Sequence, residues 1–256
     1  MSSSAAAVTT HERQRDAERT RADILDVATR EFAQRGYSGA RVDEIAARTR
    51  TTKRMIYYYF GGKEELYIAV LERAYGEIRE AERAVDVEHL EPVAAIRRLA
   101  ELTFDHHESH PDFIRLVSIE NIHQAEHIAR SAVLASLNTT AIDLIARILA
   151  AGRDEGVFHR KGVDALDVHM LISAFCVFRV ANRHTFCSIF GRDLVEPGRR
   201  DHYRRMLGDL VVAYLTSAGD VPAADGSEPG TRRRQATGTA PAARRPAAAR
   251  RRRAAD

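Results

Sequence analysis

IAARTRTTKRMIYYYFGGKEEL, residues 45–66, is the most informative segment of this 256-residue chain. The spacing of its apolar residues predicts a short helix over about 42–48 and another over about 52–59, joined by a tight turn. Two short helices joined in this way form a helix-turn-helix, whose second helix can enter the major groove of DNA, about 12 Å wide. The expected core of this motif consists of Ile45, Ala46, Ile56 and Phe60.

The predicted second helix leaves hydroxyl groups and cations on its outer face. Such side chains bind both phosphate oxygens and base edges, so this face is suited to DNA. The residues expected to face outward are Thr51, Thr52, Lys53, Arg54, Met55 and Tyr58. The aromatic run 57–60 also allows a second interpretation, core packing. We expect packing for Tyr59 and Phe60, and contact with the phosphate backbone for Tyr57 and Tyr58.

Helix signals continue on both sides of this motif. Thr20 is a good N-cap for a first helix over about 21–35, and Gly36 stands where a C-terminal glycine cap belongs. The preceding residues, 1–19, are expected to form a mobile, disordered arm. A fourth helix is predicted over about 63–84.

Over residues 19–66 the sequence resembles the TetR family of regulators. The resemblance rests on Phe32, Gly36–Tyr37, Val42–Ile45–Ala46, Ile56–Phe60 and Lys63–Leu66. It implies phosphate contacts for Thr52, Tyr57 and Lys63, and positions near base edges for Thr51, Lys53, Arg54 and Met55. It also implies a homodimer, formed by the last two long helices at about 164–190 and 197–217, and operator DNA as the partner.

Three residues depart from the usual pattern of that family. Arg50 stands where the turn commonly has glycine, which would cost on the order of 1 kcal/mol if its φ is positive. Arg54 stands where a small residue is common, and it can add a contact to a phosphate or to guanine. Gly62 replaces the usual capping Ser or Thr before the fourth helix, at a cost of about a few tenths of a kcal/mol.

The rest of the chain predicts an all-α fold, because long segments have 3.6-residue periodicity and none alternates clearly as a strand. We expect a three-helix helix-turn-helix domain at 20–66 and a helical bundle for ligand binding and dimerisation at 67–218. Further helices are predicted at about 92–108, 112–123, 128–155, 164–190 and 197–217, with a break near Leu134 left open. Residues 170–181 are apolar nearly all round, so we expect burial on several sides.

A bundle that senses a small-molecule effector needs an apolar lining with a few convergent polar groups. The apolar candidates are Phe104, Phe113, Phe175 and Phe178, and the polar ones are Arg115, Asn121, Arg179, Asn182 and His184. For each polar residue the alternative is a satisfied interface or helix-end side chain. The segments 66–71 and 110–113 also resemble, faintly, the TetR subgroup of the pyrimidine-utilisation regulator, which implies a small, polar, planar ligand.

Five histidines cluster at 106–127, and the pairs His106/His110 and His123/His127 have the i,i+4 spacing that can chelate a metal. Solvated or helix-end histidines are the interpretation we favour, with a metal-binding helical protein as the alternative. No nucleophile–base spacing and no strong metal motif is present, so neither an enzyme nor a cofactor is predicted. Cys176 and Cys187 are expected to be buried, unpaired thiols on one helix.

Charge is distributed unevenly along the chain. Residues 1–60 carry 11 Lys and Arg against 8 Asp and Glu, whereas residues 61–218 carry 19 against 24. The tail, 219–256, carries 9 against 4 and is rich in Ala, Arg and Pro, so we expect it to be disordered. Its arginines suggest an alternative function, an architectural protein that binds DNA without reading sequence. Without an apolar run of about 18 residues, no membrane span is expected, and the predicted location is the cytoplasm, in association with the nucleoid.

Overall fold

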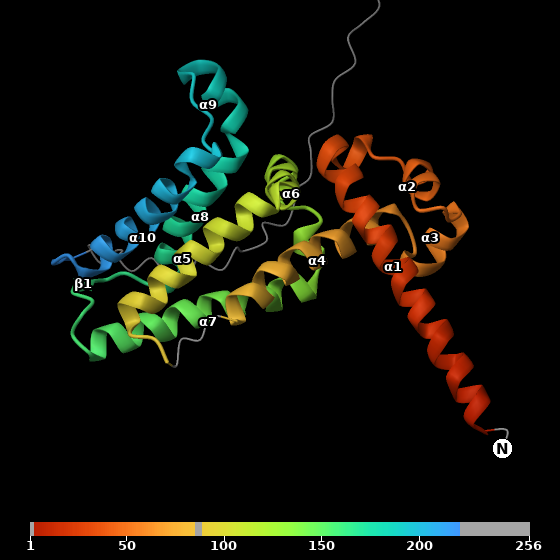
Figure 1. Cartoon of the computed structure of the whole chain (residues 1–256), viewed down its shortest axis with the longest axis horizontal. Helices are drawn as coiled ribbons and strands as arrows, with labels where there is room; N and C mark the ends of the chain where they lie inside the picture. The colour runs from red at the N-terminus through yellow and green to blue at the C-terminus, as the bar shows by residue number, and fades with distance from the viewer. Residues whose placement is uncertain (1–2, 85–88, 221–256) are drawn as a thin grey trace, which may run out of the picture. The chain divides into compact units, whose positions relative to one another are not determined.

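The computed structural model describes residues 3–84 and 89–220, and these residues are almost entirely helical (Figure 1). Two short parallel strands, β1 (Arg160–Lys161) and β2 (Gly219–Asp220), are a small addition to the predicted all-α fold. In chain order the helices are α1 (Ser3–Gly39), α2 (Val42–Arg48), α3 (Lys53–Phe60), α4 (Lys63–Arg83), α5 (Pro92–Ser109), α6 (Pro111–Ile122), the 3-10 turn η1 (Ile128–Arg130), α7 (Ala132–Asp154), α8 (Ala165–Ala181), α9 (Arg183–Phe190), the 3-10 turn η2 (Pro197–Arg199) and α10 (Arg200–Thr216).

The first helix begins earlier than predicted. α1 is helical from Ser3, so the expected disordered arm at 1–19 is wrong for residues 3–19. Thr20 is not an N-cap, because it lies inside α1 and its hydroxyl donates to the carbonyl of Asp16 at 2.8 Å. The break predicted at Gly36 is present. Its φ of 69° and ψ of 172° interrupt the helical path before the chain enters α2.

The helix-turn-helix does not have a core of its own. Phe32 of α1 and Ile56 of α3 belong to one apolar cluster with Tyr67 of α4 and Ile114 of α6. The predicted boundary between residues 66 and 67 therefore crosses a continuous core, and the described residues, 3–84 and 89–220, group as one compact unit. Because these helices share one core, a shift of α4 or α6 also changes the packing of α1, α2 and α3.

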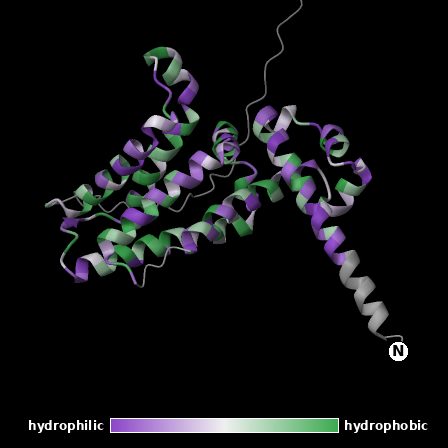
Figure 2. Ribbon diagram, in the orientation of Figure 1, coloured by the Kyte–Doolittle hydropathy of each residue, from purple (hydrophilic) through white to green (hydrophobic). Residues whose placement is uncertain are grey.

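A second apolar cluster joins α5, α7, α8 and α10 and includes Phe104, Ile148, Ile172 and Leu207. Figure 2 shows polar and apolar segments alternating along α4 and α5, as expected for helices that bury one face. The predicted break near Leu134 falls at Ser131 instead. There a 3-10 turn ends and the Ser131 hydroxyl caps α7 by accepting from the Leu134 N–H at 3.1 Å.

The single helix predicted over 164–190 is two helices, α8 and α9, bent by 66° at Asn182. The two cysteines consequently lie on different helices. Cys176 is buried, as expected, but Cys187 is exposed on α9, so the prediction of two buried thiols is wrong for Cys187.

The expectation that 170–181 is buried on several sides fails in the single chain. Met170 is 66% exposed and Phe178 is 51% exposed, on one face of α8. Among the described helices, α7 is long and apolar enough to cross a membrane, with a mean hydropathy of 1.5. Helices of a protein core meet the same criterion, and Ile145, Ile148 and Leu149 of α7 lie in the second cluster. The predicted disordered tail lies outside the described residues, except for 219–220.

Candidate DNA-binding surface and effector cavity

Helix α3 is held at both ends by local interactions. The Thr52 hydroxyl accepts from the Met55 N–H at 3.2 Å, so Thr52 is the N-cap of this helix. Gly61, with a φ of 91°, ends it. Ile56 and Phe60 are buried, as predicted, on the side of α3 that packs against α2 and α4, and they fix the rotation of the helix about its axis.

The opposite side of α3 is open to solvent. Tyr58 is 78% exposed, Tyr57 39% and Met55 37%. Lys53 and Arg54 are exposed beside them, and Lys53 Nζ lies 3.2 Å from a carboxylate oxygen of Asp43 on α2. Thr52 is exposed and Thr51 is half-buried in the turn. The structure therefore brings seven of the eight predicted DNA-contacting residues together on or next to one exposed helix.

Lys63, the eighth, lies at the first turn of α4 and is half-buried. Its Nζ is 4.9 Å from the centre of the Tyr37 ring and 3.5 Å from the Ser38 carbonyl oxygen. Burial lowers the pKa of Lys63 below its ordinary value. The turn before α3 contains Arg50 with a φ of 53°, so the strain anticipated for a non-glycine residue at that position is present. Gly62 is the N-cap of α4 and supplies no side-chain cap, as expected.

A cavity of about 160 Å³ lies between α4, α5, α6 and α8. Its apolar lining includes Phe113, Val117 and Val177, and its polar lining includes an ion pair. The Arg79 guanidinium donates to Glu82 at 2.5 Å, and both side chains are less than 10% exposed. The remaining lining residues are Tyr75, Thr103, His107, His169 and Ser173.

Burial changes the titration of these groups. The pKa of Glu82 is raised by burial, although Arg79 opposes this shift. Burial, then the charge of neighbouring His106, lowers the pKa of His107 to about 3. The pKa of His106 falls to about 4, and that of His169 is lowered by burial and by Arg79. All three histidines are therefore neutral near pH 7.

The predicted effector residues do not converge on one site. Only Phe113 lines the inner cavity, while Arg115 and His184 line an outer hollow of about 410 Å³ between α1, α6 and the α8–α9 bend. Phe104 is fully buried, Phe175 is partly buried in the second cluster, and Phe178 is exposed. Asn121 and Asn182 are helix-end residues that donate to the carbonyl groups of Val117 and Phe178.

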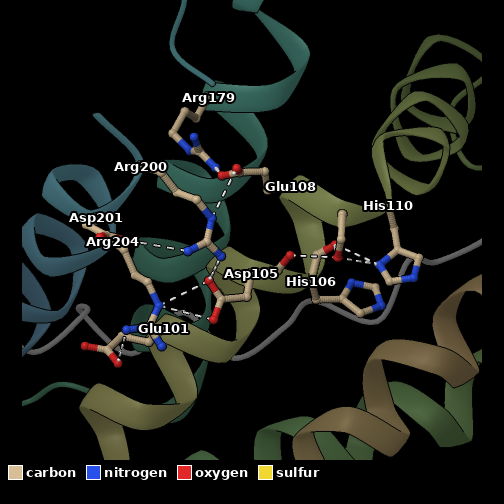
Figure 3. Close-up of polar contacts among 10 residues, drawn as sticks. Glu101, Asp105, His106, Glu108, His110, Arg179, Arg200, Asp201 and Arg204 are labelled. Atoms are coloured by element: carbon tan, nitrogen blue, oxygen red, sulfur yellow. Dashed lines mark hydrogen bonds and ion pairs between the residues drawn. The ribbon is translucent and has the colours of Figure 1, made fainter. Parts of the chain in front are cut away.

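Arg179, another predicted effector residue, takes part in an ion-pair network (Figure 3). It pairs with Glu108 of α5, donates to the Leu194 carbonyl at 2.8 Å and lies 3.9 Å from the centre of the Phe104 ring. Glu108 and Asp105 of α5 also bind Arg200 of α10, at 3.3 and 2.5 Å. These contacts join α5, α8 and α10. Arg179 is therefore a polar side chain satisfied at a helix interface, the alternative to effector binding that the sequence left open.

The interpretation that we favoured, solvated or helix-end histidines, holds for His110 and His123, which are exposed at the ends of α5 and α6. His106, His107 and His127 are all buried. His127 Nδ1 lies 3.0 Å from the Glu120 carboxylate, and its ring packs 4.4 Å from that of Tyr37. His123 ends α6, so His123 and His127 do not share a helix. In the described part of the chain, no three His, Cys, Asp or Glu side chains are grouped as metal ligands.

The sequence singled out none of Arg79, Glu82 and His169, and it placed His107 only in the histidine cluster. The available signal was the helical spacing of Tyr75, Arg79 and Glu82 on the fourth helix, for which we made no prediction. Burial of these residues depends on α5 and α8 packing over them, and that packing has no local signature.

Comparison with known proteins gives two family matches. Residues 24–70 match the model for bacterial regulatory proteins of the tetR family, and residues 92–211 match a tetracyclin repressor-like C-terminal domain. The chain is 33% identical over 203 residues to the HTH-type transcriptional repressor NicS of Pseudomonas putida, covering 79% of this chain and 95% of NicS.

Two further comparisons agree with these. The HTH-type transcriptional regulator RutR of Escherichia coli K12 is 35% identical over 112 residues, which cover 44% of this chain and 52% of RutR. The crystal structure of a transcriptional regulator, SCO4942 of Streptomyces coelicolor, is similar with a TM-score of 0.58 and 27% identity, covering 75% of this chain and 96% of that one.

Proposed function

This chain belongs to the TetR family of bacterial regulators, and on that premise we propose that it is a ligand-responsive, sequence-specific DNA-binding repressor that a small molecule releases from its operator. Such a protein acts by binding and is not an enzyme. It works in the cytoplasm, and we propose that it resides on the nucleoid. The observation that carries the proposal is one exposed recognition helix joined, through α4, to a polar cavity.

DNA binding is assigned to the exposed side of α3. Lys53 and Arg54 supply cations to the major groove, and the Tyr57 and Tyr58 hydroxyls reach phosphate oxygens. Lys63, held against Tyr37, contacts a phosphate beside the groove. Because phosphate contacts release counterions, each one steepens the salt dependence of the affinity.

A homodimer presents two copies of α3. Leu166, Met170 and Phe178 are exposed and lie on one face of α8, and Leu210 is exposed on α10. An apolar face of this length supports an interface with a second copy of the chain. Two-fold symmetry then requires half-sites whose centres lie about 34–36 Å apart, or a multiple of that distance.

Release is assigned to α4, which belongs to both sites. This helix has 21 residues and is therefore about 30 Å long. Lys63 lies in its first turn, whereas Tyr75, Arg79 and Glu82 line the cavity near its other end. In this proposal α4 has two positions, and the effector binds one of them more tightly, which changes the spacing of the two α3 helices in the dimer. The ratio of the effector's affinities for the two positions sets how far the equilibrium between them shifts.

The test measures fluorescence anisotropy with the duplex upstream of the chain's own gene. Specific binding at moderate salt is expected, with a salt slope that falls by about 2 for Lys63→Ala, which removes one phosphate contact from each subunit of the dimer. Arg147→Ala, an exposed cation on α7, is the matched control and leaves the slope unchanged. Equal affinity for the operator and for a shuffled duplex would refute the proposal and favour the architectural alternative.

A further inference from the structure

The inner cavity is lined by a buried guanidinium group, one nitrogen of which has no hydrogen-bond partner in the part of the chain that the structure describes. Arg79 is 6% exposed, and one of its terminal nitrogens binds Glu82. Its Nε has no hydrogen-bond partner among the described residues. A buried donor without a partner is unfavourable, and a ligand acceptor at that position would remove this penalty.

The geometry of a guanidinium group favours one kind of acceptor. Its planar fork of N–H groups matches the two oxygens of a carboxylate better than it matches a single carbonyl. Among the described residues that line the cavity, Glu82 is the one carboxylate. It accepts from the terminal nitrogen Nη1 of Arg79, on the side of the guanidinium group away from Nε. A second carboxylate can therefore approach Nε from the cavity.

The size and the walls of the cavity restrict the rest of the ligand. A volume of about 160 Å³ is below the roughly 300–1,000 Å³ of sites for drug-sized molecules. Phe113 presents an apolar wall, and its ring is already packed edge-on by Tyr75 at 5.1 Å and by His107 at 5.4 Å. Only a compact body fits beside it.

We propose that the effector is a compact carboxylic acid, bound as its anion with the carboxylate on Arg79 and its body against Phe113, Val117 and Val177. This assignment rests on the proposed function, in which the cavity is the sensing site. Of the residues assigned to ligand contact, only Phe113 was expected from the sequence to line the effector site.

The charge balance of this complex requires a proton. With neutral histidines the lining has one cation, Arg79, and one anion, Glu82, so an incoming anion leaves an uncompensated negative charge in a buried site. The groups that face it are Tyr75 from α4, His106 and His107 from α5, and His169 from α8, with Glu120 of α6 behind Tyr75. One proton from the solvent, taken up by Glu82 or by an imidazole, restores neutrality.

The experiment titrates the dimeric full-length protein by calorimetry with three acids, benzoate, 2-furoate and cyclohexanecarboxylate, and with the carboxamide of each. At least one acid is expected to bind at least about tenfold more tightly than its amide. Titrations at pH 7 in phosphate and in Tris, which differ in ionisation enthalpy, are expected to reveal uptake of close to one proton per ligand.

Two variants separate recognition from folding. Glu82→Gln removes the competing carboxylate but keeps a hydrogen-bond acceptor for Arg79, so it is expected to tighten acid binding, a change that a merely structural residue would not produce. The double variant Arg79→Met with Glu82→Leu replaces the buried pair by apolar groups and is expected to fold but to lose acid binding. Asp112→Asn, in the exposed Arg115–Asp112 pair of the same spacing, is the control and leaves binding unchanged.

The outcomes are distinct for the two proposals. If no acid binds, if the amides bind as tightly as the acids, or if the double variant still binds the acid, the carboxylate assignment is overturned. Operator binding by the same protein preparation then shows whether the proposed function holds without the carboxylate assignment. Failure to bind the operator would overturn the proposed function itself.

Discussion

Glu120 is the residue whose removal should most weaken the connection between the DNA-binding helices and the bundle. It is 1% exposed near the end of α6. One carboxylate oxygen accepts from the N–H groups of His127 and Ile128 at 3.2 and 3.1 Å, and the other lies 3.0 Å from His127 Nδ1. The His127 ring in turn packs 4.8 Å from that of Tyr67 on α4.

The turn that Glu120 closes is strained. Gln124 and Ala125 both have a φ of 58°, a left-handed conformation that costs about 1–2 kcal/mol per non-glycine residue. Hydrogen bonds to a charged acceptor contribute about 1.5–3 kcal/mol each, and two backbone donors lose theirs in Glu120→Ala. We therefore expect a loss of about 3–5 kcal/mol in the free energy of unfolding. For Glu120→Gln we expect a loss of about 1 kcal/mol, because its carbonyl oxygen can still accept from both backbone groups.

Urea unfolding at equal dimer concentration measures both values, since stability depends on the concentration of an associating protein. The Gln variant is the matched control for the Ala variant. If the two variants unfold within about 1 kcal/mol of each other, the hydrogen bonds of Glu120 do not stabilise this turn, and the reasoning is refuted.

Three further predictions concern the turn, the buried histidines and the dimer face. Arg50→Gly should raise stability by about 0.5–1 kcal/mol, seen as a higher melting temperature, because glycine removes the left-handed strain at a smaller entropic cost. The lowered pKa of His107, about 3, means that the unfolded chain gains its proton near pH 6.5 while the folded chain does not. The contribution of this group to the free energy of unfolding should therefore be complete above pH 6.5 and should decrease towards pH 4, by up to about 1.4 kcal/mol per pH unit. In urea unfolding, His107→Gln should reduce this dependence of stability on pH. Met170→Glu should yield monomers in light scattering, because it places a charge in the proposed interface.

Each of these predictions has a control. Arg30→Gly, in the exposed interior of α1, should lower stability by about 1 kcal/mol, so equal effects of the two glycine variants would contradict the strain at Arg50. An unchanged slope between pH 6.5 and 4 in His107→Gln would show that this histidine is not held neutral. Ile122→Glu, 75% exposed on α6, should remain dimeric. If the Met170→Glu variant is still dimeric, α8 is not part of the interface.

The sequence predicted the DNA-binding half well because its signals are local. The buried pair Ile56 and Phe60, the exposed side of α3 and the glycine cap at Gly36 follow from interactions within a few residues, whereas the predicted N-cap at Thr20 lies inside α1. The end of the helix at Asn182 could not be predicted in this way, because residues 170–190 keep helical periodicity on both sides of the bend. The burial of Arg79 and His107 also depends on distant helices, and buried charges are rare enough that exposure is the default expectation.

Two copies of α3, one from each subunit, are expected to occupy two major grooves on one face of the same operator. Hydroxyl-radical and methylation footprinting of the chain's own upstream DNA tests this arrangement most directly. The prediction is a pair of protected major-groove segments related by two-fold symmetry, centred about 34–36 Å apart or a multiple of that, and lost with Tyr58→Ala and Lys53→Ala. Uniform protection, or one unpaired segment that survives these substitutions, would contradict it.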